Sequence, residues 1–234
     1  MKKIFIIIPA LLVFFSIQVN AQCKIENKYF QPGETITMDL YFKYGILYTK
    51  AGSSTLKMED ATYNGTNAYK MSLIAGSSGF ARKMFSLNDT LTSYMTRALV
   101  PLEFVKRAHE GKEYTQENTT YSYSGSGINI HTKRIKDGVL RFDENMTTTD
   151  CVYDMISVVY YARTLDYSKM KKGDEHGIEF ISGKKKVYMV IEHGGVEKLE
   201  ANDNKKYECI KLVLSITNGN KLAFDNKEEA MTVY

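Results

Sequence analysis

Arg163 is the residue whose type and position most clearly suggest chemistry. It lies near the C-terminal end of a stretch in which apolar residues recur every three or four positions, which is the spacing of a helix. At 100° per residue, Arg163 lies on the apolar side of this helix. The apolar side carries Val152, Ile156 and Val159, and the narrow polar stripe opposite carries Asp154, Ser157 and Tyr161.

Two interpretations of Arg163 are open. Its guanidinium group can reach outward to the last carbonyl groups of the helix, with a favourable helix-dipole contribution of about 0.3–1 kcal/mol. Alternatively, a partly buried guanidinium group can bind a carboxylate of the protein or of a ligand through two parallel hydrogen bonds. We favour the first interpretation. The candidate ligand-binding residues under the second are Arg163, Tyr160, Asp154 and Ser157.

Catalytic motifs do not occur in the sequence. A hydrolase needs a nucleophile, a base and an orienting acid, yet there is no Gly-x-Ser-x-Gly or His-Glu-x-x-His motif, and the four histidines are scattered. Gly-rich nucleotide-binding motifs are missing as well. The sequence predicts a protein that is not an enzyme and has no cofactor and no metal site. An enzyme stays the third alternative, with His131 or His193 in a pair of titratable groups.

One predicted helix, over residues 150–165, positions the candidate residues. Thr147 and Asp150 form a Ser/Thr-x-x-Asp/Glu capping pattern in front of it. Nearly all of the remaining chain from Phe30 onward alternates apolar and polar residues with a period of two, which is typical of half-buried strands.

Strands are expected at residues 35–42, 52–59, 68–75, 83–95, 102–109, 113–123, 128–135, 139–143, 178–181, 187–192, 196–201, 207–217 and 229–234. Turn pairs such as Asn64-Gly65 and Asp137-Gly138 separate them. Many short strands at regular spacing predict a mostly β fold: a large curved antiparallel sheet or open half-barrel, with the helix at about 150–165 packed against it.

The first 21 residues have the composition of a signal peptide. Two lysines precede an apolar run over residues 4–17, and Ala21 stands at the expected cleavage site. The run of fourteen residues is shorter than the roughly 20 that a membrane-spanning helix needs. Lipidation of Cys23 is a less favoured alternative, because the preceding Gln22 is larger than the residue usual before a lipoprotein cysteine. We expect export to the periplasm or the outer-envelope surface.

Residues 22–234 are expected to form a single β-rich domain with little net charge. Loss of residues 1–21 removes two lysines and no acid, which lowers the net charge from +4 to +2. The basic clusters at 169–172 and 184–186 lie among glycines, so they are read as solvated loops and not as a nucleic-acid-binding face. A second apolar run long enough to span a membrane is not found.

Cys151 and Cys209 are each surrounded by apolar residues. Because an unpaired cysteine is a good small hydrophobic core residue, we expect two buried thiols. A disulfide between them is the alternative in an oxidising compartment.

Several motifs together resemble a known family. The stretch 152–163, VYDMISVVYYAR, is followed by Lys172-Gly173-Asp174 and a strand through residues 207–211, and the front of the chain adds Pro32-Gly33-Glu34, Gly45, Ala51-Gly52 and Pro101-Leu102. This pattern resembles the bacterial exported family called domain of unknown function 3108. The resemblance implies an envelope protein of mostly antiparallel β-structure without an assigned activity. It also implies further strands after the last expected one, at residues 229–234. We expect this chain to lack those further strands.

These observations favour a non-enzymatic binding protein of the cell envelope. A curved sheet rich in Tyr, Phe and Met, with a helix as its cover, suits an apolar or lipid-like ligand. By looser similarity, the expected architecture resembles the half-barrel carriers that ferry lipoproteins across the periplasm. The alternative is a structural or adaptor component that binds another envelope protein through an exposed sheet edge.

Overall fold

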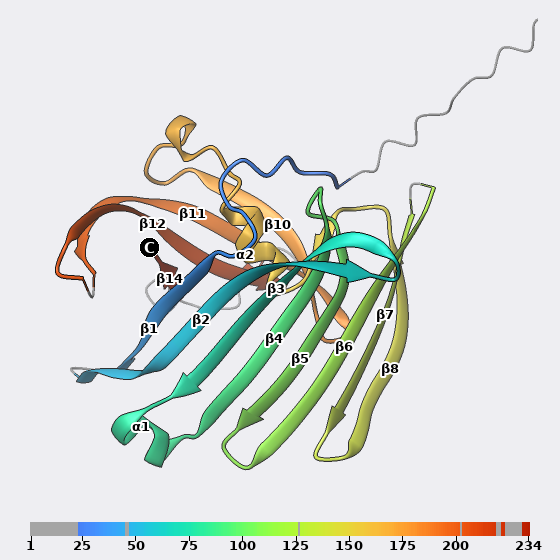
Figure 1. The fold of residues 1–234 in the computed structure, drawn as a ribbon, viewed down its shortest axis with the longest axis horizontal. Coiled ribbons are helices and arrows are strands. Elements are labelled where there is room, and N and C mark those ends of the chain that lie inside the picture. The colour runs from blue at the N-terminus through green and yellow to red at the C-terminus, as the bar shows by residue number, and fades with distance from the viewer. Residues whose placement is uncertain (1–22, 45–46, 126, 202, 219–220, 223–230) are drawn as a thin grey trace, which may run out of the picture.

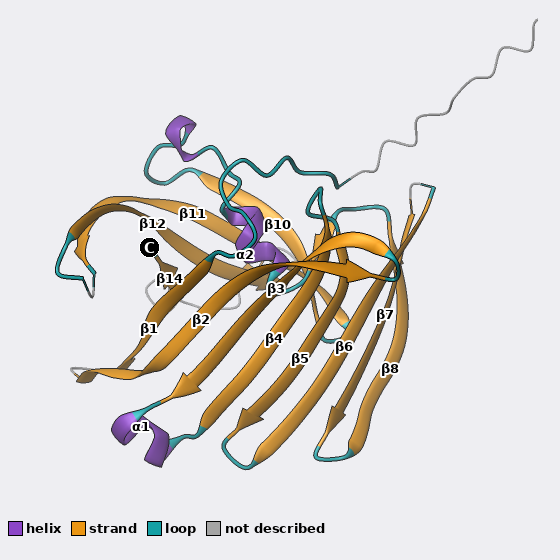
Figure 2. Cartoon of the chain, viewed as in Figure 1, coloured by secondary structure: helices purple, strands orange, loops and turns teal. Residues whose placement is uncertain are grey.

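The computed structural model describes residues 23–234, except 45–46, 126, 202, 219–220 and 223–230 (Figure 1). The expected signal peptide, residues 1–21, lies outside the described residues. Strands make up most of the described chain (Figure 2), and short helices interrupt them.

The first sheet is an antiparallel meander of eight strands, which neighbour one another in chain order. It consists of β1 (Thr35–Tyr44), β2 (Leu47–Tyr63), β3 (Thr66–Ser77), β4 (Leu87–Thr96), β5 (Pro101–Glu110), β6 (Glu113–Ser124), β7 (Gly127–Lys136) and β8 (Val139–Thr148). Its alternating burial follows the period-two pattern of the sequence: in β4, Asp89, Leu91, Ser93 and Met95 are buried.

The second sheet is formed by the C-terminal part of the chain, in the order β13-β12-β11-β10-β9, with β14 paired to β12. Its strands are β9 (Val152–Tyr153), β10 (Glu175–Ser182), β11 (Lys185–Glu200), β12 (Lys206–Asn218), β13 (Lys221–Leu222) and β14 (Met231–Val233). The pair β9 and β10 is parallel, whereas the others are antiparallel. The predicted mostly β, half-barrel-like architecture with a packed helix is confirmed.

The helix α2 (Ser157–Ala162) lies between the two sheets (Figure 1). Ile156 and Tyr160 belong to the core of the first sheet, and Val158 belongs to that of the second. The core of the first sheet also contains Phe30, Leu56, Met58, Met71, Leu91, Met95, Leu99 and Phe104. α2 therefore joins two apolar cores that the chain builds far apart in sequence.

The predicted helix at 150–165 is wrong in its extent. Residues 152–153 form β9 instead, because they pair in parallel with Glu179 and Phe180 of β10. The proposed cap residue Thr147 lies inside β8. The assignment of faces is wrong as well: Asp154 and Ser157 are fully buried, whereas Val159 is 38% exposed. Local hydrogen bonds satisfy the polar pair, which permits its burial.

Two further short helices were not predicted: α1 (Gly79–Met84) and the 3-10 helix η1 (Tyr167–Lys169). α1 occupies the connection between β3 and β4, where the period-two pattern predicted a strand from residue 83. Its Phe80 and Met84 side chains are exposed, so the apolar residues of this tip do not form the buried face that the strand prediction assumed.

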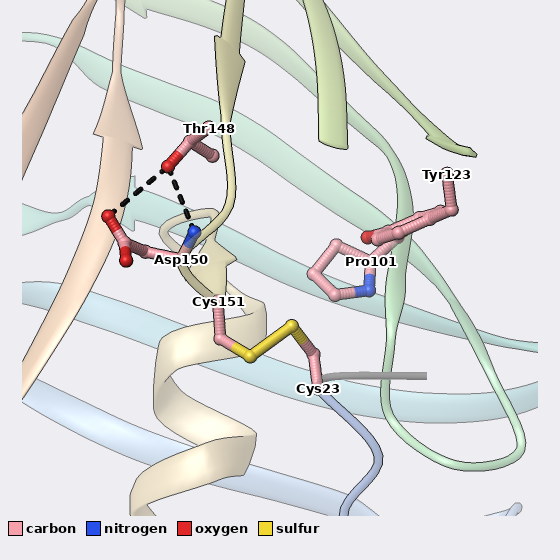
Figure 3. Close-up of a disulfide and its surroundings, with 6 residues drawn as sticks. All are labelled: Cys23, Pro101, Tyr123, Thr148, Asp150 and Cys151. Carbon is pink, nitrogen blue, oxygen red and sulfur yellow. Dashed lines mark hydrogen bonds between the residues drawn. A yellow bond between two sulfur atoms is a disulfide. The ribbon is translucent and has the colours of Figure 1, made fainter. Parts of the chain in front are cut away.

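The expectation for the cysteines is wrong. Cys151 forms a disulfide with Cys23, across 128 residues of sequence (Figure 3), and Cys209 is a half-buried thiol. The N-terminal segment runs back across the sheets, where the Ile25 N–H group donates a hydrogen bond to the Ala98 carbonyl group over 2.9 Å. This path brings Cys23 to the start of β9, a long-range contact that no local sequence pattern indicates.

Candidate functional site

Asp154 begins the turn that leads into α2. Its Oδ1 atom accepts hydrogen bonds from the N–H groups of Ile156 (2.9 Å) and Ser157 (2.8 Å), and the Ser157 hydroxyl accepts one from the Asp154 N–H group (2.7 Å). This reciprocal arrangement is a capping box. The Ser93 hydroxyl of β4 donates to Oδ2 over 2.8 Å. Asp154 thus starts the helix and also fastens it to the first sheet.

Complete burial raises the pKa of the Asp154 carboxyl group. The hydrogen bonds from Ser157, Ser93 and Ile156 act in the opposite direction, because they stabilise the charged form. Tyr160 makes a second attachment of α2: its ring meets that of Phe30 edge-on at 4.9 Å, and its hydroxyl donates to the carbonyl oxygen of Lys57 over 3.3 Å.

Arg163 forms a bidentate ion pair with Glu34, which directly precedes β1. The two N–O distances are 2.6 and 2.7 Å. The guanidinium group also lies over the rings of Phe30, at 4.8 Å, and Tyr160, at 5.4 Å. Of the two interpretations, the second describes the structure, with a carboxylate of the protein as the partner. The favoured contact with the last helical carbonyl groups is not what the structure shows.

We expect Arg163→Lys to lower the free energy of unfolding by about 1–2 kcal/mol, because lysine keeps the charge but loses the second hydrogen bond and the planar stacking. Thermal unfolding measures this change. Arg97→Lys is the matched control, since Arg97 also pairs with a carboxylate, that of Asp60, and covers the ring of Tyr69, but at an exposed position. It should change stability by at most about 0.5 kcal/mol. Equal losses in both variants would contradict the role assigned to Arg163.

The four candidate ligand-binding residues therefore have partners within the chain. Arg163, Tyr160, Asp154 and Ser157 hold α2 against the first sheet. A direct role in ligand binding stays a prediction for each of them. Tyr161, assigned to the same polar stripe, points toward the second sheet, where its hydroxyl lies 2.5 Å from Nε2 of His176.

An open cleft of about 480 Å³ lies on this side of α2, between the N-terminal segment and the edge of the second sheet. We call it the tyrosine cleft. Its lining comprises Cys23, Lys24, Ile25, Asp150, Cys151, Tyr153, Tyr161, Gly177, Ile178, Glu179 and Tyr188. Both cysteines of the disulfide, which Figure 3 shows, belong to this lining. Another open cleft, of about 550 Å³, lies along the same segment beside Tyr69 and Arg97, but it has a single aromatic ring in its lining.

The wall of the tyrosine cleft is aromatic. The rings of Tyr153 and Tyr161 are 5.0 Å apart, and burial raises the pKa of both hydroxyls. Tyr188 lies across Gly177, where an added Cβ atom would meet its hydroxyl oxygen at 1.6 Å. Glycine at position 177 therefore makes room for the ring of Tyr188. Such packing of an aromatic ring over a strand glycine pins the register of neighbouring strands.

Charged groups lie at the edge of the tyrosine cleft. Nζ of Lys186 lies 2.8 Å from carboxylate oxygens of both Asp150 and Glu179. The hydrogen bond from Lys186 lowers the pKa of Asp150. A cleft with apolar rings inside and paired charges at its edge suits a ligand with an apolar body and a polar end.

Sequence reasoning missed most of this cleft. Tyr153 and Tyr161 lie in the stretch that we singled out, but Tyr188, Gly177 and Cys23 come from distant segments. Tyr188 lies in β11, two strands away from β9 in the sheet. No pattern in a single sequence indicates that an exposed tyrosine there lines the same cleft as Tyr153.

The histidines do not converge. His131 pairs with Asp143 on the exposed side of β7 and β8, whereas His193 lies beside Tyr167, with ring centres 6.2 Å apart. Among the described residues, no group of three or more His, Cys, Asp or Glu side chains is arranged to hold a metal ion. In the part of the chain that the structure describes, no helix has the length and apolarity needed to cross a membrane.

Comparison with known proteins gives one match. The family model described as "Protein of unknown function (DUF3108)" matches residues 30–234. No curated protein and no solved structure matches the chain.

Proposed function

Since the chain belongs to the family of proteins of unknown function DUF3108, we propose its role from its structure: a non-enzymatic binding protein of the cell envelope that receives an amphipathic ligand in the tyrosine cleft. The observation that carries this proposal is the combination of three tyrosine side chains with a charged edge, formed by Asp150, Glu179 and Lys186, in one open cleft of about 480 Å³. Binding sites for small molecules typically have volumes of about 300–1,000 Å³ and aromatic walls with few polar groups.

The disulfide supports the envelope as the compartment. Disulfides form and persist in oxidising environments such as the bacterial periplasm. Because Sγ of Cys23 is bonded to Cys151, this sulfur is not available for the thioether bond of a lipoprotein. Secretion without lipidation is the localisation that fits this bond.

Tyr188→Ala tests the cleft. We expect the affinity for the fluorescent apolar probe N-phenyl-1-naphthylamine to fall about tenfold, which corresponds to the loss of about 1.4 kcal/mol of apolar contact. Gly177→Ala should weaken binding as well, because the added methyl group displaces the ring of Tyr188. Titration of the probe by fluorescence measures both effects.

Tyr207→Ala is the matched control, since Tyr207 is a tyrosine of similar exposure, 46% against 41% for Tyr188, and does not line the cleft. Equal affinity in Tyr188→Ala, Tyr207→Ala and the unaltered protein would refute the cleft as the binding site. Native mass spectrometry on protein purified from its own host would identify the ligand class by mass.

An adaptor role is the second candidate, and the edge strand β8 favours it. Nine of the ten residues of β8 pair with β7, and in the described chain its other edge carries no strand. An unpaired edge offers backbone hydrogen-bonding groups to a partner strand. A stable envelope protein captured by the purified chain, together with failure to bind the apolar probe, would favour this candidate over the binding protein.

A further inference from the structure

The tip between β3 and β4 exposes apolar and basic side chains together. It comprises α1 and the residue that follows, Phe85. Phe80 is 73% exposed, Met84 75% and Phe85 55%, and α1 has no buried residue. Arg82 and Lys83 lie between these apolar residues, and residues 79–85 contain no acid. Large apolar side chains are rarely left in water in such a group without a function.

This tip is fixed to its neighbours and does not project alone. The Ser78 N–H group donates to the carbonyl oxygen of Ala51 over 2.9 Å, and the Gly111 N–H group donates to that of Ser86 over 2.7 Å. The ring of Phe85 covers Gly111, where an added Cβ atom would lie 3.5 Å from it. The β3–β4 tip and the β5–β6 tip therefore form one surface.

The β7–β8 tip continues this surface. The Asp137 N–H group donates to the carbonyl oxygen of Tyr114 over 2.9 Å, and the Tyr114 N–H group donates to Oδ1 of Asp137 over 2.7 Å. Val139 and Leu140, just after this turn, are 55% and 53% exposed. The three tips lie at the same end of the first sheet (Figure 1). We call them the rim: residues 79–85, 110–113 and 136–140.

The unpaired charge of the rim is positive. Glu110 pairs with Lys106 at 3.0 Å, and Glu113 pairs with Lys136 at 2.6 Å. Asp137 accepts a hydrogen bond from the Tyr114 N–H group and keeps its negative charge, so three unpaired bases stand against one carboxylate. Among the described residues, Arg82, Lys83 and Lys112 have no carboxylate within ion-pair distance. Arg82 and Lys83 belong to the same tip as Phe80 and Met84, and Lys112 belongs to the adjoining tip.

The opposite end of the sheet has a different character. There the β2–β3 turn is Asn64-Gly65, and β6 ends in Ser124-Gly125. Both turns are formed by small polar residues, which are the usual residues of solvated turns. The β4–β5 turn at that end contains Leu99 and Val100, but both are buried, and its Arg97 is paired with Asp60. Exposed apolar side chains beside unpaired bases are therefore found at the rim and not in these three turns.

We propose that the rim docks onto the surface of an anionic phospholipid bilayer. Phe80, Met84 and Leu140 would enter the boundary between head groups and acyl chains, while Arg82, Lys83 and Lys112 would contact the phosphate layer. Interfacial membrane binding by amphipathic segments combines apolar insertion with attraction to anionic lipids in this way. β8 runs from the rim to Thr148, two residues before Asp150 of the tyrosine cleft, so about 30 Å of strand separates the rim from the cleft.

The absence of Trp from the sequence allows a direct test. Phe80→Trp places a single tryptophan in the rim. With vesicles of phosphatidylglycerol and phosphatidylcholine in equal parts, its emission should shift to shorter wavelength and be quenched by brominated acyl chains. Val196→Trp is the matched control, because Val196 of β11 is also exposed, at 60%, and lies outside the rim. Its emission should not change.

The contribution of charge is measured in the Phe80→Trp protein, whose tryptophan reports vesicle binding. Arg82→Gln together with Lys83→Gln should lower partitioning into the anionic vesicles about tenfold or more, whereas Lys198→Gln with Lys205→Gln, at exposed positions outside the rim, should leave it unchanged. Vesicles of phosphatidylcholine alone should bind much less protein. Circular dichroism checks that each variant is folded.

An unshifted emission of Phe80→Trp with anionic vesicles would overturn the proposal, as would an equal shift of Val196→Trp. Loss of a captured envelope protein in the rim variants, without any vesicle binding by the unaltered chain, would also overturn it and identify a protein as the occupant. None of these outcomes depends on the tyrosine cleft, so the two proposals fail separately.

Discussion

Replacing Cys23 and Cys151 by serine is expected to lower the free energy of unfolding by about 5 kcal/mol. The disulfide closes a loop with a sequence separation of 128 residues, and the loss of loop-closure entropy from the unfolded chain grows with loop length to about this value. A typical domain has a total stability of about 5–15 kcal/mol, so the loss would be a large part of it.

Denaturant unfolding of the double variant and of the unaltered protein measures this difference. Cys209→Ser is the control, because Cys209 is half-buried and unpaired; we expect it to change stability by at most about 1 kcal/mol. A double variant as stable as the control would contradict the bond between Cys23 and Cys151. The loss of the bond should also free the N-terminal segment, which lines both clefts.

The strands were predictable because their signal is local. An alternation such as that of Ile210, Leu212 and Leu214 follows from one buried and one exposed face, and β12 is found there. The order of β1 to β8 also follows from short turns, which place successive strands side by side.

The centre of the molecule was less predictable, because long-range contacts decide it. Residues 152–153 have a helical spacing, yet pairing with β10 turns them into a strand. Asp154 and Ser157 were assigned to a polar stripe, but they satisfy each other's hydrogen bonds and are buried. The partner of Arg163 is 129 residues away in sequence. Residue type indicated that Arg163 could bind a carboxylate, but not which one.

Asp154→Ala is expected to lower the free energy of unfolding by about 3 kcal/mol. The substitution removes the cap of α2, which contributes about 1 kcal/mol, and leaves the Ser93 hydroxyl and two backbone N–H groups buried without their acceptor. Asp154→Asn should stay within about 1 kcal/mol of the unaltered protein at neutral pH, because the amide oxygen can accept the same backbone hydrogen bonds and no charge is buried.

The pH dependence of the same pair of proteins tests the protonation of Asp154. Because burial raises the pKa of this carboxyl group, the folded protein holds a proton that the unfolded chain has lost when the pH lies between the unfolded value, about 4, and the raised one. Stability should fall as the pH rises through this interval, and Asp154→Asn should lack this fall. The free energy of unfolding of Asp154→Asn relative to that of the unaltered protein should therefore be greater at neutral pH than in acid.

The opposite pH dependence of Asp154→Asn would show that the carboxylate form of Asp154 is favoured in the folded protein. Tyr121 and Tyr123, whose pKa values respond to the charge of Asp154, do not obscure this trend, because burial raises both pKa values and the two hydroxyls stay neutral at these pH values. An advantage of Asp154→Asn that grows toward acid would show that the donors Ser93, Ile156 and Ser157 outweigh burial. The carboxylate would then be stabilised in the folded protein, and the attachment of α2 would weaken as the pH falls.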